Sequence, residues 1–227
     1  MVRYGYAMMT EQAGPRDLVA QAVGAERVGF DFSVISGHSF PWLESQGHAP
    51  YAWSVLGAAA QATSTPPIGI AMSGERSCAI AGRYGDLAIA TEPRRELLAA
   101  FDAHGGAGKP CIGQLPVCYD TDRDAAITRA HDQFRRSLGG WQMNAELPGP
   151  AGFGQATAHV RPEDVADAIP CGNDVHAFVE AVRPFHEAGF TEIALIQAGG
   201  DRQEPIRRWA HEELLPALRG PVRRGTP

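Results

Sequence analysis

Hydrophobic and polar positions along the chain alternate between two patterns, one typical of strands and one typical of helices. Short apolar, β-branched runs follow glycines, and stretches with apolar residues three or four positions apart come between them. Six strands are predicted, at about 3–8, 30–36, 68–72, 86–91, 111–119 and 191–197. Helices are predicted at about 15–27, 51–63, 75–84, 94–103, 121–137, 162–169, 174–188 and 205–218. Strands that alternate with helices predict an α/β fold of parallel βα units with right-handed crossovers.

The order strand, helix, glycine, strand recurs along the chain. The sequence around Gly29 is echoed around Gly82 and Gly189, where a helical pattern again ends in glycine and an apolar run follows. We therefore expect one domain over residues 1–220 and a frayed tail at 221–227. The glycine- and proline-rich stretch 139–160 is longer than a usual connection, so it is either an excursion that covers a site or a flexible insert.

Composition narrows the classes of function. The formal net charge of −6 argues against nucleic-acid binding, which needs a basic face. No apolar run approaches the roughly 18 to 20 residues that span a bilayer, and no signal-peptide core is present, so we expect a cytoplasmic protein. The four cysteines fit neither a zinc motif nor a redox pair and are expected to be reduced, buried thiols. No histidine or acidic cluster has the spacing of a metal site.

The loop after the second predicted strand carries candidate chemistry. The strand, 30–36, is expected to be buried, and His38, Trp42 and His48 follow it. A histidine at the carboxyl end of a strand can donate a hydrogen bond to a bound ring, and a tryptophan can form a flat wall for a planar ligand. The alternative is that these residues only brace a long loop.

A second candidate is the turn after the third predicted strand. Ala71, Met72, Ser73 and Gly74 lie between a strand and a helix, where free backbone amides and the helix dipole can bind an anion. The alternative is a serine that caps the helix. Neither a P-loop nor a dinucleotide-binding glycine fingerprint is present. The segment 197–202 follows the last strand and could also contact a ligand.

Several stretches together resemble the luciferase-like oxidoreductases that use flavin or the deazaflavin coenzyme F-420 (F420). They are Tyr4-Gly5-Tyr6, Gly14-Pro15-Arg16, 29–36, His38, Pro41-Trp42, 47–50, 71–74, 81–91 and 213–218. The branch that the chain resembles most contains the F420-dependent glucose-6-phosphate dehydrogenases. Members of this family are (β/α)8 barrels of about 250 residues or more. This chain is shorter, and the resemblance implies that the third and fourth βα units are missing near 62–67.

The resemblance also implies roles for individual residues. His38 and Trp42 would lie at the reacting ring as catalytic residues. His38, Ala71, Met72, Ser73, Gly74 and Thr91 would bind the cofactor, F420 or FMN. His48 and Arg94 are expected at the substrate, with Arg94 standing in for lysines that have no match. Gly37 occupies a position where the family often has aspartate.

Removing two strands from a parallel barrel exposes both neighbouring strands. The remaining strands could close a smaller barrel, stay open like a horseshoe, or pair with a second chain. We expect the second and third strands to be neighbours and a homodimer to cover what is exposed. The expected function is hydride transfer between the cofactor and a small-molecule substrate. The alternative is a remnant without chemistry that acts as a binding or partner subunit.

Overall fold

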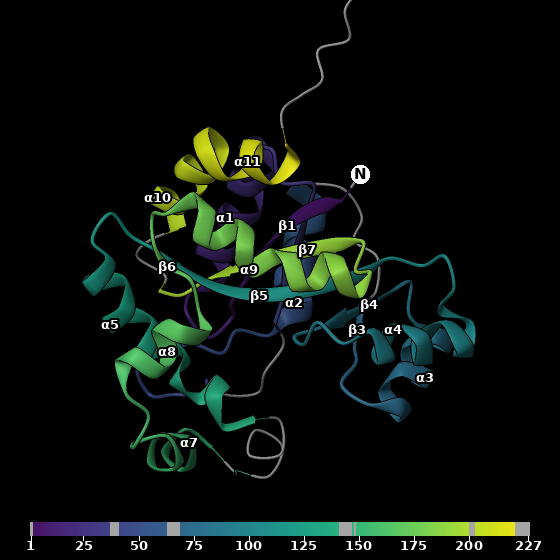
Figure 1. Cartoon of the computed structure of the whole chain (residues 1–227), viewed down its shortest axis with the longest axis horizontal. Coiled ribbons are helices and arrows are strands. Elements are labelled where there is room, and N and C mark those ends of the chain that lie inside the picture. The colour runs from purple at the N-terminus through teal and green to yellow at the C-terminus, as the bar shows by residue number, and fades with distance from the viewer. Residues whose placement is uncertain are drawn as a thin grey trace, which may run out of the picture.

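The strands of the computed structural model form one curved parallel sheet (Figure 1). The structure describes residues 2–36, 41–62, 69–140, 147, 149–199 and 203–220. The strands are β1 (Arg3–Met8), β2 (Phe32–Ile35), β3 (Gly69–Ala71), β4 (Leu87–Ala90), β5 (Cys111–Tyr119), β6 (Cys171–Gly172) and β7 (Glu192–Gln197). All six predicted strands are present. The two-residue β6, which pairs with the end of β5, has too few apolar residues to be recognised in the sequence.

The sheet is open. Its order is β2-β1-β7-β5-β4-β3, with β6 beside β5, and every pairing is parallel. The expectation that the second and third strands are neighbours is therefore wrong, because β2 and β3 lie at opposite ends of the sheet. The last strand, β7, pairs with the first, β1, as in a closed barrel, and the opening falls between β2 and β3, where the two units are missing. The fold is a parallel half-barrel derived from a TIM barrel.

The strand β2 lies at one edge of the sheet, and this position changes its environment. Its four residues are half-buried or exposed, so the expectation of a buried strand is wrong. An edge strand has a neighbour on one side only, and its side chains lose the cover that a second neighbour provides. Phe32 nevertheless packs closely, since a Cβ placed on Gly5 of β1 would lie 2.2 Å from its ring.

Helices flank the sheet on both faces and at its ends. Their bounds are α1 (Pro15–Arg27), α2 (Ala52–Ala62), α3 (Glu75–Tyr84), α4 (Arg95–Phe101), α5 (Arg123–Phe134), α7 (Pro150–Ala156), α8 (Pro162–Ala168), α9 (Val175–Ala188), α10 (Gln203–Trp209) and α11 (Leu215–Arg219). Figure 1 shows α3 and α4 beside β3 and β4, whereas α5, α7 and α8 lie at the opposite side of the molecule. The helix expected at 205–218 is three consecutive segments, with the π-helical η4 (Ala210–Leu214) in the middle.

The stretch 139–160 is not wholly irregular. Proline at the first turn of α7 supplies a preset backbone angle, and Phe153 is fully buried, so tertiary packing stabilises a helix of only seven residues. The prediction missed this helix because two of its seven residues, Gly152 and Gly154, are glycines, which disfavour helix and leave no apolar periodicity.

Apolar side chains form a core on each face of the sheet. The larger one joins one face of the strands to α1, α3, α9 and the C-terminal helices, and Tyr4, Leu18, Phe101, Phe178 and Leu195 are among its members. The second joins the other face to α5 and α8 through Ile112, Ala126, Ala130, Val165 and Ile196. Across the described ranges, no helix has the length and apolar character needed to cross a membrane.

Candidate functional site

The carboxyl ends of the strands provide the framework of a site. Because every pairing is parallel, the segments after β1, β2, β3, β4, β5 and β7 all leave the sheet at the same edge. In open and closed α/β sheets this edge is where ligands bind. The segments that the sequence indicated, after β2 and β3, are among them.

The loop after β2 folds toward the excursion between β5 and β6. Trp42 is half-buried, and its ring meets the ring of Phe153 in α7 edge-on, with centroids 5.0 Å apart. The guanidinium of Arg136 lies 4.5 Å from the centroid of the Trp42 ring, in a cation–π arrangement. Of the two alternatives for the stretch 139–160, its described part is therefore an excursion that covers the β2 loop. His38 lies outside the described residues.

Hydrogen bonds fix this loop to α5. The side-chain oxygen of Gln46 accepts from the backbone amides of Trp42 and Leu43, at 2.9 and 3.1 Å. Its amide nitrogen donates to the carbonyl of Gln133 in α5 at 3.3 Å, and Gln46 is only 4% exposed. A buried carboxamide that satisfies two backbone donors holds the loop in one conformation. Trp42 is thus presented by a rigid loop.

In the turn after β3, the backbone amides expected to be free for an anion have a partner within the chain. The backbone amides of Ser73 and Gly74 both donate to the hydroxyl oxygen of Ser77, at 3.0 and 3.1 Å. That hydroxyl donates in turn to the Gly74 carbonyl at 2.8 Å. Both amides therefore converge on one oxygen atom, and an anion would have to replace the Ser77 hydroxyl to bind them. The serine that caps the helix is Ser77, one turn into α3.

The other members of the predicted site have distinct environments. The side chain of Met72 is 3% exposed and contacts the Cys78 thiol, so only its backbone can meet a ligand. Ala71 and Thr91 are exposed at the ends of β3 and β4. Arg94 is exposed and pairs with Glu92 at 3.3 Å, which reduces its value as an anion ligand.

Glu11, which follows β1, is a polar group at the mouth that the sequence argument missed. Its side chain is fully buried and accepts a hydrogen bond of 2.8 Å from the Ser36 hydroxyl at the end of β2. The Thr10 hydroxyl also donates to it, at 3.3 Å. His48 is exposed, and its backbone amide donates to the Glu11 carbonyl at 3.1 Å. The signal that could have found Glu11 is a carboxylate in the loop directly after a parallel strand.

Arg136 is a cation that this carboxylate influences electrostatically. The pKa of Arg136 is lowered to about 10 by burial, and the Glu11 carboxylate offsets part of this effect. Even so, the guanidinium is charged at neutral pH. A half-buried cation, a buried carboxylate and an indole ring therefore lie near the ends of β1 and β2.

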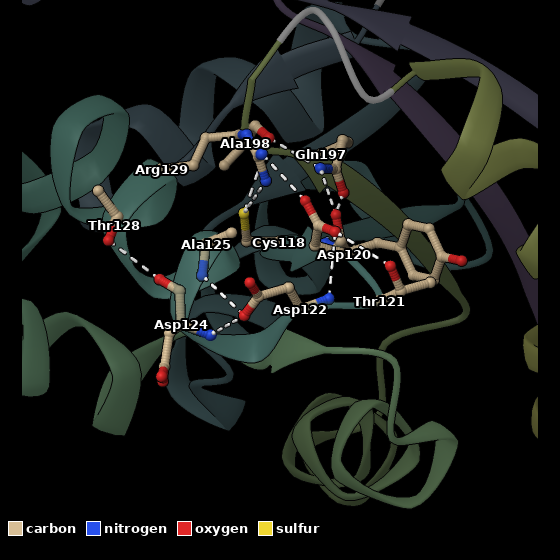
Figure 2. A network of polar contacts seen from close by, with 11 residues as sticks. Cys118, Asp120, Thr121, Asp122, Asp124, Ala125, Thr128, Arg129, Gln197 and Ala198 are labelled. Carbon is tan, nitrogen blue, oxygen red and sulfur yellow. Dashed lines mark hydrogen bonds and ion pairs between the residues drawn. The ribbon is translucent and has the colours of Figure 1, made fainter.

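A second polar network lies at the ends of β5 and β7 (Figure 2). Asp120, 5% exposed, pairs with Arg129 of α5 at 3.0 Å. Gln197, 1% exposed, accepts from the Tyr119 amide at 2.9 Å and donates to the Ala198 carbonyl at 2.7 Å. These contacts use the polar atoms to join strands and helix, so the network stabilises the rim of the mouth. Residues 200–202 lie outside the described part of the chain.

A cavity of about 310 Å³ lies between α8, β6 and the start of α9. Its lining includes Arg123, Pro170, Cys171, Asn173 and Ala177. Burial raises the pKa of the Cys171 thiol to about 12, so this cysteine is not an activated nucleophile. Within the described ranges, no group of three or more histidine, cysteine or acidic side chains could hold a metal.

The structure thus brings some predicted residues together and separates others. Trp42 joins Glu11 and Arg136 at the ends of β1 and β2. The turn at Ser73 and Gly74 shares the same carboxyl edge but follows β3, at the other end of the open sheet. The mouth of the half-barrel therefore has two polar sides, one toward each end of the open sheet.

Comparisons with known proteins define the class. Residues 2–73 match the family model of the luciferase-like monooxygenases. An F420-dependent glucose-6-phosphate dehydrogenase of Segniliparus rotundus is 47% identical over 68 residues, which are 30% of this chain and 20% of that protein. The corresponding enzyme of Amycolatopsis mediterranei is 46% identical over 69 residues. This chain thus spans about a fifth of the length of these relatives.

Solved structures extend the likeness to the whole fold. An F420-dependent secondary alcohol dehydrogenase, in complex with an F420-acetone adduct, superposes with a TM-score of 0.77 at 16% identity, covering 96% of this chain and 99% of the other. The coenzyme F420-dependent tetrahydromethanopterin reductase of Methanopyrus kandleri gives 0.62 at 14% identity, with coverages of 96% and 99%. At such identities the likeness shows the fold alone.

The chain is therefore a half-barrel with the fold of F420-dependent enzymes. Over residues 2–73 it matches, more specifically, the luciferase-like monooxygenase family, and the proteins similar to it there include F420-dependent glucose-6-phosphate dehydrogenases.

Proposed function

We propose that this chain is a luciferase-like oxidoreductase that binds F420, or FMN in its place, at the carboxyl edge of the half-barrel and transfers hydride to or from a small organic substrate. One observation carries the proposal. The segment that matches the family, 2–73, is also the segment that places Glu11, Trp42 and Ser73 at that edge. The two relatives whose names state the use of F420 match over this same part of the chain.

The donor set at the β3 turn is compatible with a cofactor phosphate. The amides of Ser73 and Gly74 already converge on one oxygen atom, that of Ser77, and a phosphate oxygen can take its place. Dihydro-F420 or dihydro-FMN supplies the hydride when bound. Around it, Trp42 would exclude water from one side and His38 would donate a hydrogen bond near the reacting ring position.

Titration of the purified full chain with F420 and FMN tests the proposal. We expect saturable binding by at least one of them, followed by absorbance and fluorescence. Riboflavin, which lacks the phosphate, should bind at least about tenfold more weakly than FMN if the turn holds the phosphate, because charge-assisted hydrogen bonds are lost. No binding of F420 or FMN at high micromolar concentration would contradict the proposal.

Catalysis is tested separately with a matched pair of histidine variants. His38→Ala should lower the rate of hydride transfer, measured as F420 or FMN turnover against a panel of alcohols and sugar phosphates. His159→Ala, at an exposed site beyond α7, should leave the rate unchanged. Equal rates for the two variants would remove His38 from the proposed chemistry.

A second candidate, a binding or partner subunit without chemistry, is favoured by the open sheet. In the described part of the chain, β2 and β3 each have a neighbouring strand on one side only. Tight complex formation with a full-length relative, together with no binding of F420 or FMN, would support this candidate over the enzyme.

We further propose that a second copy of the chain covers the surface of α2. Residues 45–74 contain no aspartate, glutamate, lysine or arginine, in a chain that is 20% charged. The residues exposed there are small or aromatic: Tyr51 (71% exposed), Ser54, Gly57, Ala58 and Ala62. Two chains that each carry a net charge of −6 meet with least repulsion on an uncharged face.

Light scattering after size exclusion tests this interface. We expect twice the mass of the 24.3 kDa chain for the natural sequence. Ala58→Arg should shift the protein to monomer, because it buries an unpaired charge in the interface. Ala158→Arg, at an exposed position after α7, is the matched control and should leave the dimer intact. A monomeric natural protein refutes the interface.

A further inference from the structure

Two buried polar groups beside Glu11 have unused hydrogen-bonding capacity. The side-chain oxygen and nitrogen of Gln12 are both shielded from solvent, and neither has a hydrogen-bond partner among the described residues. The Nε of Arg136 is in the same state. Folded proteins rarely leave such groups unpaired, because each costs the full penalty of its desolvation. Unpaired groups at the carboxyl edge of a parallel sheet therefore indicate a polar ligand.

Their position links these two groups to one place. Gln12 follows Glu11 in the loop after β1, and its backbone amide donates to the carbonyl of Met9 at the end of that strand. Arg136 is influenced electrostatically by Glu11 and lies over the ring of Trp42. The two unpaired groups thus flank the side of the mouth where the β1 and β2 loops meet.

Their chemistry limits what they can bind. A carboxamide with both ends free presents one donor and one acceptor side by side, and Arg136 adds a further donor from its Nε. The complementary ligand edge is planar and has an N–H between two carbonyl oxygens. A pyrimidinedione ring has this edge: its N–H can donate to the Gln12 oxygen, and its carbonyls can accept from the Gln12 nitrogen and from Arg136.

We infer that Gln12 and Arg136 bind the pyrimidinedione edge of a flavin or deazaflavin ring. This inference rests on the proposed function, because it names the part of the proposed cofactor that the β1 loop holds. Both residues are positioning residues, since they orient the ring and take no part in hydride transfer. The phosphate turn after β3 lies on the opposite side of the mouth, so the two contacts would hold the two ends of an extended cofactor.

Lumiflavin and 3-methyl-lumiflavin provide the test, because they share the ring system, lack the phosphate, and differ only in whether the ring N–H is blocked. Binding is followed by quenching of flavin fluorescence with the full chain. We expect the natural sequence to bind lumiflavin at least about tenfold more tightly than its methylated analogue, corresponding to about 1.4 kcal/mol. In Gln12→Met the difference should fall to within about twofold, because the paired atoms are gone.

Controls separate ring recognition from folding. Gln155→Met, on the exposed side of α7, should keep the tenfold preference. Arg136→Met should weaken lumiflavin binding several-fold. Gln12→Met should not lower the melting temperature, because Gln12 loses no hydrogen-bond partner. A lower melting temperature, equal binding of the two flavins by the natural chain, or a preference that persists in Gln12→Met would overturn the inference.

The outcome is distinguishable from that of the proposed function. If F420 or FMN binds and turns over but blocking the ring N–H has no effect, the proposed function stands and the assignment of Gln12 fails. If the chain prefers lumiflavin over 3-methyl-lumiflavin but F420 and FMN show no turnover, the assignment of Gln12 stands and the proposed hydride-transfer activity is wrong. If lumiflavin does not bind at all, the assignment of Gln12 is wrong.

Discussion

The hydroxyl of Ser77 allows the anion cradle to be tested by a single deletion. It accepts from the amides of Ser73 and Gly74 at 3.0 and 3.1 Å and therefore occupies the atoms proposed to hold a phosphate. Ser77→Ala removes this internal partner. The substitution should lower the stability of the free protein and, at the same time, leave the two amides available for a ligand.

The magnitude follows from two opposing effects. Loss of a serine that caps a helix terminus costs about 1–2 kcal/mol. Alanine is favoured over serine within a helix by about 0.5 kcal/mol, which offsets part of the loss. The net decrease in the free energy of unfolding is then about 0.5–1.5 kcal/mol, or roughly 1–6 °C in melting temperature for a chain of this length. Gln155→Ala, on the exposed side of α7, experiences only the helix-propensity effect and should be slightly stabilising.

The assay combines thermal denaturation with titration of FMN. In Ser77→Ala the affinity for FMN should be maintained or rise by up to about fivefold, because the phosphate no longer competes with the hydroxyl for the amides. The preference for FMN over riboflavin should rise with it. A weaker affinity for FMN together with lower stability would refute the reasoning, since it would show that Ser77 organises the turn for the ligand rather than substituting for it.

Three further perturbations test the packing and the electrostatics. Gly5→Ala should destabilise the fold by at least about 2 kcal/mol in denaturant titration, because its Cβ would lie 2.2 Å from the Phe32 ring, and Phe32→Leu in the same chain should recover part of the loss. Arg129→Met should cost about 3 kcal/mol by removing the ion-pair partner of the buried Asp120, with the loss reduced in the double variant that also carries Asp120→Asn. Burial raises the pKa of the Cys171 thiol to about 12, so this thiol should resist thiol reagents at pH 8. The stability of the protein should fall as the pH rises above 9.0, because the unfolded chain loses the Cys171 proton at a lower pH than the folded chain does. Rapid labelling of Cys171 in the folded protein at pH 8 would contradict this.

Most of the fold could be predicted from local pattern. Periodicity located the strands other than β6 and the longer helices, because β-branched runs and glycine-ended helices follow from the preferences of single residues. The residues after β2 and β3 could be assigned to one edge of the sheet, since parallel strands put all their carboxyl ends together. The short α7 and β6 were beyond local pattern, because their stability comes from contacts such as that of Phe153 with Trp42.

The pairing of the strands was decided by the tertiary structure. Each strand of a parallel sheet can pair with a strand on either side, and the sequence does not specify which two strands pair. The expectation that β2 and β3 would meet therefore failed, and the half-burial of β2 follows from its place at the edge. The same uncertainty applied to the site, because Glu11, Arg136 and Trp42 come from three separate segments.

The sequence by itself determined the parallel βα architecture, the likeness of residues 2–73 to the luciferase-like monooxygenases and the edge of the sheet at which the loops after the strands gather. Only the tertiary structure decided that the sheet stays open, that Ser77 accepts from the amide of Ser73, and that the Gln12 carboxamide and the Arg136 Nε have no hydrogen-bond partner among the described residues. The physical reason is range: helix and strand preferences act between residues a few positions apart, whereas strand order and hydrogen-bond pairing depend on segments brought together from distant parts of the chain.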